Sequence, residues 1–272
     1  MKKFKFLPLW ALALAIGFAG CNDDPDGPVE IIEDGYYVVG EAAASTTIVA
    51  NGKMTNGINE ADQKELAGLY DKYVALEAGK TFKIMKKAGV EEASYGGVLA
   101  VDTLRGEESQ IGGGEGNQVA IQKGALIENG AGFQVPGNGL YQIVVYETTA
   151  GANVFVIPVE WQLNGVGQDA EDGGGYKLVA GAFNKETMTF TLPSVKFEMG
   201  SKFKVKNHDG WKVKLAEGVF INCNFGLNKE GVFKYDGSNN SVLPGGADIV
   251  TPISARGYYT ITLTWTLGTG WS

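Results

Sequence analysis

Alternation of hydrophobic and polar residues is the feature that most limits how this chain can fold. Over residues 187–192, Met, Phe and Leu alternate with three threonines, and over 202–206 Phe and Val alternate with three lysines. Residues 258–265 place Tyr, Ile, Leu and Trp on one parity. Because successive side chains of a strand point to opposite faces, these segments predict antiparallel strands with one buried and one solvated face.

Glycine supports the same fold class, because it makes up 40 of the 272 residues, about twice the usual share of about 7%. Gly-rich stretches at 112–114 and 173–175 separate strand-like segments and indicate turns. A single segment favours a helix, in which Asn59 would cap a short run to Leu69 with Leu66 and Leu69 facing inward. The sequence therefore predicts an all-β protein.

The sequence also contains an internal repeat. Residues 74–84 resemble 195–205, and residues 138–145 resemble 256–263, in the same order and at nearly the same spacing. Each half has about the usual size of an immunoglobulin-like β-sandwich. We therefore expect two tandem antiparallel β-sandwich domains, over 35–152 and 153–272, preceded by a signal peptide over 1–20 and a tether over 21–34.

The start of the chain has the composition of a secretory signal peptide. Three lysines within residues 2–5 precede an apolar run over 6–19, which is shorter than the roughly 20 residues that span a bilayer. Small residues directly before Cys21 resemble the bacterial lipobox, which implies that Cys21 is acylated and becomes the N-terminus. The alternative is an ordinary signal peptide with a cysteine nearby by chance.

The segment after Cys21 is acidic and contains two prolines, so we expect an extended tether over 21–34. Acidic residues directly after the lipidated cysteine resemble the surface-export signal of Bacteroidetes lipoproteins; the alternative is a solvated linker without a signal. Since no later apolar run reaches spanning length, we expect a lipid anchor and no membrane span. The resemblance to the export signal implies a place in the outer membrane, facing the cell exterior.

Charge and composition exclude several functions. The formal net charge is −8, and an acidic chain repels phosphate backbones, so nucleic acid is not an expected partner. One His and two Cys exclude a zinc site built from several such ligands, and we predict no metal and no cofactor. With Cys21 lipidated, Cys223 has no disulfide partner, and its strand-like surroundings predict a buried thiol. No catalytic residue is predicted.

Several motifs carry a family resemblance. Both halves contain Gly-x-x-Phe-Lys-Ile/Val, at 79–84 and 200–205, and Gly-x-Tyr-x-Ile, at 139–143 and 257–261. With the lipobox and the segment from Phe203 to Trp211, they resemble the SusE/SusF-like outer-membrane lipoproteins of Bacteroidetes glycan-utilisation systems. The first half lacks the Trp, and the chain is shorter than the starch-binding members, so α-glucan specificity does not carry over.

This resemblance implies a non-catalytic, surface-exposed protein with carbohydrate-binding-module-like domains. Its expected partners are a polysaccharide or oligosaccharide and the outer-membrane importer complex of the same system. Two alternatives remain open: a structural or adhesive surface lipoprotein such as a pilus-type subunit, and a glycoside hydrolase with an unrecognised carboxylate pair.

Aromatic residues guide the search for a sugar site, because flat rings stack on the C–H faces of sugars. Trp161 and Trp265 share parity with aliphatic neighbours and are expected in the core, whereas Trp271 fits either the core or a site. Trp211 follows a turn but also shares parity with aliphatic residues. The predicted carbohydrate-binding residues are three aromatics at loop edges and three polar neighbours, whose alternative is a solvated face: Trp211, Tyr176, Tyr235, Lys206, Asn207 and Lys212.

Overall fold

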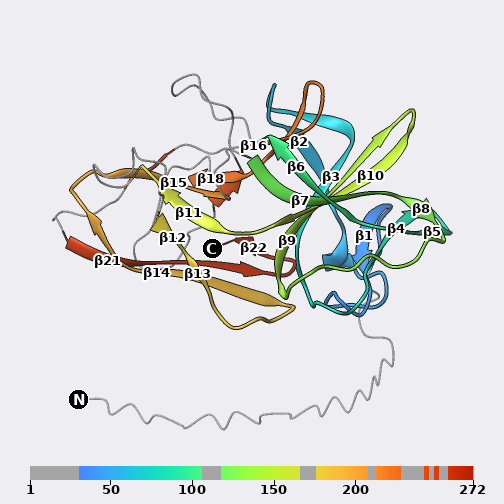
Figure 1. The fold of residues 1–272 in the computed structure, drawn as a ribbon, viewed down its shortest axis with the longest axis horizontal. Coiled ribbons are helices and arrows are strands. Elements are labelled where there is room, and N and C mark those ends of the chain that lie inside the picture. Colours follow the sequence, from blue (N-terminus) through green and yellow to red (C-terminus); the bar gives the residue numbers. More distant parts are fainter. Residues whose placement is uncertain are drawn as a thin grey trace, which may run out of the picture. The chain divides into compact units, whose positions relative to one another are not determined.

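The computed structural model describes residues 31–105, 118–165, 176–207, 212–227, 242–244, 248–250 and 257–271. These residues form strands, turns and one short 3-10 helix, η1 (Ala50–Gly52), and they contain no α-helix (Figure 1). They belong to one compact unit, Ile31–Ser272. The all-β prediction is confirmed.

The first half contains a four-stranded and a six-stranded antiparallel sheet. In spatial order, the smaller sheet consists of β1 (Gly35–Val39), β4 (Lys83–Ala88), β5 (Glu91–Gly96) and β8 (Ile127–Glu128). The larger sheet, also in spatial order, consists of β2 (Thr55–Asn59), β3 (Lys64–Leu76), β9 (Gly139–Thr148), β10 (Gly151–Pro158), β7 (Gln118–Ala125) and β6 (Ala100–Arg105). Buried side chains of both sheets, including Ile84 and Ile143, share one core between them.

The second half repeats this two-sheet arrangement. One sheet contains β12 (Tyr176–Lys177), β11 (Trp161–Asn164), β15 (Lys202–Asn207), β18 (Asn224–Leu227) and β19 (Val242–Pro244), with β20 (Ile249–Val250) paired to β15. The other contains β13 (Val179–Ala180), β14 (Thr187–Phe197), β21 (Gly257–Thr266) and β22 (Gly270–Trp271). Trp161 and Trp265 lie in the core of this half, which confirms their predicted burial.

Strand register confirms that the sequence repeat is a structural one. Leu76 pairs with Gly139 across β3 and β9, and at the matching positions Phe197 pairs with Gly257 across β14 and β21. Two glycines that the sequence comparison did not match also correspond. A Cβ on Gly40 would lie 2.5 Å from the Thr81 carbonyl oxygen, and one on Gly165 would lie 2.8 Å from the Lys202 carbonyl oxygen. Each of these two glycines therefore packs directly against the backbone of the segment opposite it.

The predicted helix from Asn59 to Leu69 is wrong. Asn59 ends β2, and the chain turns and returns as β3, whose register with β2 shifts between Asn56 and Ile58. This irregularity lets Leu66 and Leu69, three residues apart, contact one apolar cluster. An irregularity in strand pairing therefore produced the spacing that resembled a helical face.

A further hairpin, β16 (Lys212–Ala216) and β17 (Val219–Asn222), lies outside the two sheets of its own half. Its side chains, among them Val213 and Ile221, pack against Leu69, Val144 and Phe155 on the outer face of the six-stranded sheet. The hairpin turn is held by the side chain of a residue in the first half. The halves therefore share a core as well as a sequence pattern.

That side chain is the carboxamide of Asn59. Its Oδ1 accepts the Phe220 N–H at 3.0 Å, and its Nδ2 donates to the Gly218 carbonyl at 3.0 Å. The division into two domains at residues 152 and 153 stays a prediction. Since β10 continues to Pro158 and pairs with β9 along its length, we propose that the first half extends to Pro158.

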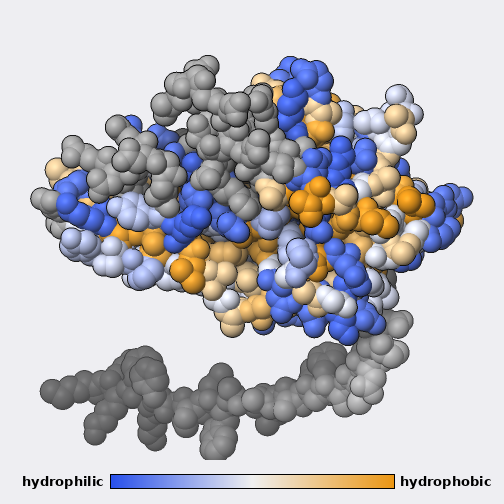
Figure 2. Space-filling model, in the orientation of Figure 1, coloured by the Kyte–Doolittle hydropathy of each residue, from blue (hydrophilic) through white to orange (hydrophobic). Residues whose placement is uncertain are grey.

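Hydrophobic residues are also exposed at separate places on the surface. Those of the first half include Val90, Val98, Val101 and Ile127. Figure 2 shows hydrophobic residues among hydrophilic ones over the strands of this half. Such scattered residues are normal on soluble domains and do not by themselves mark a binding surface.

Candidate functional site

The outer face of the six-stranded sheet of the first half divides into three zones along β3 and β9. At one end, Ala75 and Leu140 pack into the core of the second half. At the other end, Leu69 and Val144 lie under the β16–β17 hairpin. The middle zone carries polar and aromatic side chains instead of aliphatic ones. The two apolar contacts therefore flank a stretch of sheet that is built differently.

A cleft of about 590 Å³ lies over this middle zone. Its wall on the first half includes Asp71 and Tyr73 of β3 and Gln142 of β9, where Tyr73 and Gln142 are register partners. Its other residues come from β2 and from the second half, including Asn222, Phe225, Trp265, Thr269 and Trp271. Both halves of the repeat therefore contribute to one cleft.

Aromatic rings form one side of the cleft. Tyr73, Phe225 and Trp271 line it, and Trp161 packs behind them. Every pair among these four rings has centroids between 5.0 and 6.1 Å apart, in tilted or edge-to-face arrangements. The Nε1 atoms of Trp161 and Trp271 are buried and have no hydrogen-bond partner within the described part of the chain. The four rings therefore form one continuous aromatic cluster.

Polar side chains form the floor of the cleft. The Asp71 carboxyl accepts a hydrogen bond from Gln142 Nε2 at 3.1 Å. Thr55 Oγ1 lies 3.2 Å from Asp71 Oδ1 and 3.1 Å from the Asp71 backbone carbonyl oxygen, and its one proton is shared between them. The same Gln142 nitrogen lies 3.3 Å from the Asn222 carbonyl oxygen, and Gln142 is only 2% exposed. The Gln142 amide thus links the Asp71 carboxyl to the hairpin and fixes the carboxyl in place.

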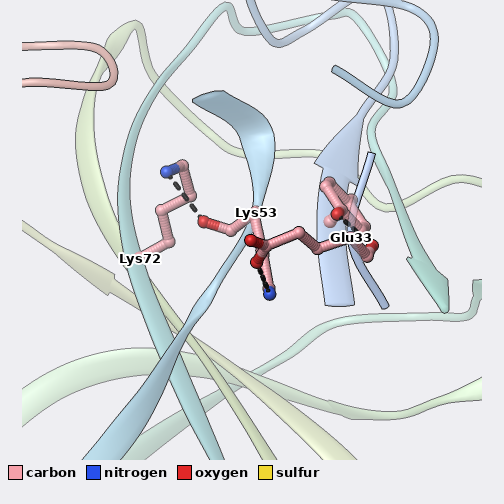
Figure 3. Close-up of polar contacts among 4 residues, drawn as sticks. Glu33, Lys53 and Lys72 are labelled. Carbon is pink, nitrogen blue, oxygen red and sulfur yellow. Dashed lines mark hydrogen bonds and ion pairs between the residues drawn. The ribbon is translucent and has the colours of Figure 1, made fainter. Parts of the chain in front are cut away.

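The charge of Asp71 is not neutralised by an ion pair with any described residue. Burial raises the pKa of Asp71, while the hydrogen bonds from Gln142 and Thr55 and the nearby charge of Lys72 act in the opposite direction. Lys72 also lines the cleft, but its Nζ donates to the Lys53 carbonyl at 3.0 Å, and Lys53 in turn pairs with Glu33 (Figure 3). Burial lowers the pKa of Lys72.

Two further groups near Asp71 stay protonated. Burial raises the pKa of Tyr73 well above its ordinary value, and among the described residues its hydroxyl has no hydrogen-bond partner. Burial also raises the pKa of Cys223 to about 12, and its Sγ lies 3.9 Å from Gln142 Oε1. Cys223 is buried, as predicted, and its thiol is not the thiolate that nucleophilic chemistry requires.

The sequence-predicted site residues lie elsewhere or outside the described residues. Trp211 and Tyr235 lie outside them. Tyr176 begins β12 and packs, partly buried, against the core of the second half. Lys212 Nζ lies 4.8 Å from the centroid of the Phe220 ring. Neither Tyr176 nor Lys212 lines the cleft.

Lys206 and Asn207 end β15 and are both buried. Lys206 is 5% exposed rather than solvated, because β11 and β18 flank β15 at this position. Asn207 Oδ1 accepts the Glu160 N–H at 2.6 Å, and its Nδ2 donates to the Pro158 carbonyl at 3.0 Å. Asn207 therefore holds the start of β11 in place, and neither residue lines the cleft.

Sequence reasoning missed Asp71, Tyr73 and Gln142 as site residues. Asp71 and Tyr73 follow directly on the segment that was predicted to be helical. A usable signal exists, since Leu69, Asp71, Tyr73 and Ala75 share one parity, and a carboxyl and a phenol interrupt an otherwise apolar face. Trp271, which the sequence left open between core and site, contacts the core and also lines the cleft.

The described residues contain no helix that is long and apolar enough to cross a membrane. Within the same residues, no group of three or more His, Cys, Asp or Glu side chains is placed to hold a metal ion.

Comparisons with known proteins give a distant similarity. No protein-family model matches the chain, and no curated protein matches it. Among solved structures, it is similar to SusF from Bacteroides thetaiotaomicron, with 16% identity and a TM-score of 0.28. The match covers 86% of this chain and 47% of the SusF chain, so this chain spans about half the length of that structure.

Proposed function

We propose that this protein is a non-catalytic, surface-exposed lipoprotein that binds polysaccharide, and that the cleft between the halves is its glycan site. The observation that carries the proposal is the position of Tyr73, Phe225 and Trp271 beside the polar floor of Asp71 and Gln142. A sugar has apolar C–H faces and a rim of hydroxyls, and this combination of rings and fixed polar groups matches both.

The cleft has a suitable size and favours binding over hydrolysis. Its volume of about 590 Å³ lies within the range of roughly 300–1,000 Å³ typical of small-ligand sites. A glycosidase needs two carboxyl groups that face each other across the scissile bond. Of the described residues that line the cleft, only Asp71 carries a carboxyl group, so this arrangement supports a binding role.

The sequence supports the cellular part of the proposal. The lipobox-like segment before Cys21 would place a lipid on that residue, and the acidic tether over 21–34 would hold the folded unit away from the membrane. From the outer face of the outer membrane, the protein would hold polysaccharide near an importer complex of the same system.

The test is a panel of glycans scored by retarded migration in native affinity gels, followed by calorimetry with the glycan that binds. Removing the ring in Trp271→Ala should weaken binding about fivefold to tenfold, since one stacked face contributes on the order of 1 kcal/mol. Tyr258→Ala is the matched control, because Tyr258 is an aromatic residue that is 72% exposed and lies outside the cleft.

Because Trp271 also contacts the core, a second variant keeps the test independent of folding. Thr269 is exposed and lines the cleft, so Thr269→Arg narrows the cleft with little effect on stability. Loss of binding in Thr269→Arg at an unchanged melting temperature supports the proposal. Unchanged binding in both cleft variants, with loss of binding in Trp211→Ala or Tyr235→Ala, would instead place the site at the sequence-predicted residues.

A further inference from the structure

The charge around Asp71 bears on which glycans the cleft can hold. Asp71 is the one acidic residue among the described residues that line the cleft, and it has no ion pair within the described chain. The nearest candidate cation is Lys72, whose ammonium group is bound by the Lys53 carbonyl instead (Figure 3). A ligand in the cleft therefore meets a carboxyl group that has no ion-pair partner among the described residues, and the charge of Lys72 acts on it only through space.

The hydrogen bonds of Asp71 leave acceptor capacity on both oxygens. Gln142 donates to Oδ2, and the Thr55 hydroxyl is shared between Oδ1 and the Asp71 backbone carbonyl, so each carboxyl oxygen has at most one bond. An ionised carboxylate has about four acceptor positions, so each oxygen can accept one more hydrogen bond. Two adjacent hydroxyls of a sugar ring are a matched pair of donors for such a carboxylate, and charge-assisted bonds of this kind are the stronger ones.

A sugar that carries its own carboxylate has the opposite relation to this site. Two like charges a few ångströms apart repel each other, and this repulsion grows as water is excluded. A uronate would need a cation to offset both the repulsion and its own desolvation. The described lining residues offer only Lys72, which is bonded elsewhere and whose pKa burial lowers.

We infer that the cleft selects uncharged sugar units and excludes uronates, with the Asp71 carboxylate accepting hydrogen bonds from two adjacent hydroxyls. This inference rests on the proposed glycan-binding function. It adds the ligand class and the residue that determines it. Stacking on the rings sets where the sugar lies, and Asp71 sets which sugars are accepted.

The test compares neutral polymers with forms of the same polymers that carry a carboxylate at C6. Amylopectin, laminarin, xyloglucan and galactomannan are each measured beside their own C6-oxidised forms, in which the hydroxymethyl groups have become carboxylates. The wild-type protein should bind at least one neutral polymer about tenfold or more tightly than its oxidised form. This comparison needs no variant and so does not depend on the folding of one.

Asp71→Asn then assigns the selection to one residue. The variant has nearly the same shape but loses the charge, so neutral binding should weaken about tenfold to a hundredfold, and the ratio of neutral to oxidised binding should shrink. Glu128→Gln is the matched control, because it removes one negative charge from an exposed position on β8. Its ratio should equal that of the wild type.

The outcomes separate the two proposals. If no polymer of either charge binds, the proposed function is overturned. If an oxidised form binds as well as its neutral parent, or if Asp71→Asn leaves the ratio unchanged, the charge selection is overturned while glycan binding stands. A neutral preference that Asp71→Asn reduces and Glu128→Gln keeps supports both.

Discussion

The two halves of the molecule share a strand order but differ in what lies against their sheets. The order β1-β4-β5-β8 of the first half corresponds to β11-β15-β18-β19 of the second, and β2-β3-β9-β10 corresponds to β13-β14-β21-β22. In the first half, β4 turns directly into β5. In the second half, the chain between β15 and β18 also forms the β16–β17 hairpin.

This insertion gives the two copies different roles. The hairpin covers one end of the outer sheet face of the first half, and the core of the second half covers the other end. The cleft lies over the interval of polar and aromatic side chains left between these two contacts. A repeat of like domains thus acquires one unlike site, because one copy supplies the sheet face and the other copy supplies most of the aromatic rings.

The largest effect is expected where the hairpin contacts the first half. Ile221 is 2% exposed in the cluster shared by the halves, so Ile221→Asp buries an unpaired charge and should lower the free energy of unfolding by about 3–5 kcal/mol. Calorimetric unfolding measures this. The matched control is Val101→Asp on β6, where Val101 is 77% exposed and the change should stay within about 0.5 kcal/mol.

If Ile221→Asp costs no more than Val101→Asp, the shared core does not stabilise the molecule and the halves behave as independent domains. If instead the variant unfolds in two separated transitions, the hairpin contact is what makes the halves unfold together. A single transition at a lower temperature is the result expected from one continuous core.

The sequence was sufficient to predict the fold class and the repeat, but it was not sufficient to predict the cleft. The reason is physical. Alternation reports which side chains of one strand share a face, and it placed Trp161 and Trp265 correctly. It does not report which faces meet. The cleft joins Asp71 to Trp271, which are distant in sequence, and it depends on a hairpin whose partner sheet no local pattern identifies. The irregular pairing of β2 and β3 beside Leu69 also gave the strand that carries Asp71 a helix-like spacing.

A second, smaller effect tests whether the two copies use the same local packing. Gly40 (φ +136°) and Gly165 (φ +93°) each approach the backbone of the following repeat motif too closely for a Cβ. Gly40→Ala and Gly165→Ala should each lower the free energy of unfolding by about 1–3 kcal/mol. Gly151→Ala is the control, because Gly151 has φ +129° but nothing within 4 Å of a Cβ.

Urea unfolding curves of the three variants give the loss of unfolding free energy in each. They distinguish a loss caused by the close contact of the new Cβ from a loss caused by the positive φ. Losses in Gly40→Ala and Gly165→Ala that are similar to each other and larger than the loss in Gly151→Ala would extend the repeat beyond the matched motifs. A loss in only one of the two would mean that the copies have diverged at this contact, and equal losses in all three would attribute the effect to φ alone.

The smallest effect concerns Asp71 in the cleft floor, between the two apolar contacts. We expect it as a dependence of the free energy of unfolding on pH. Burial raises the folded-state pKa of Asp71 above its value in the unfolded chain. As the pH falls through that raised pKa, the folded state takes up a proton before the unfolded state does, so the wild type gains stability. Tyr73 and Cys223 have raised pKa values and do not ionise between about pH 4 and pH 8.

The Asp71→Asn variant has no carboxyl group that could take up this proton. The stability of the wild type relative to the variant should therefore rise as the pH is lowered from about 7.5 towards 4. Melting temperatures of the two proteins across that range measure the difference, and Glu128→Gln corrects for the general effect of removing one negative charge. A difference that stays constant with pH would mean that the Asp71 carboxyl is as well solvated as in the unfolded chain. The cleft floor would then be open to solvent, and burial at Asp71 would make no measurable contribution to the stability of the fold.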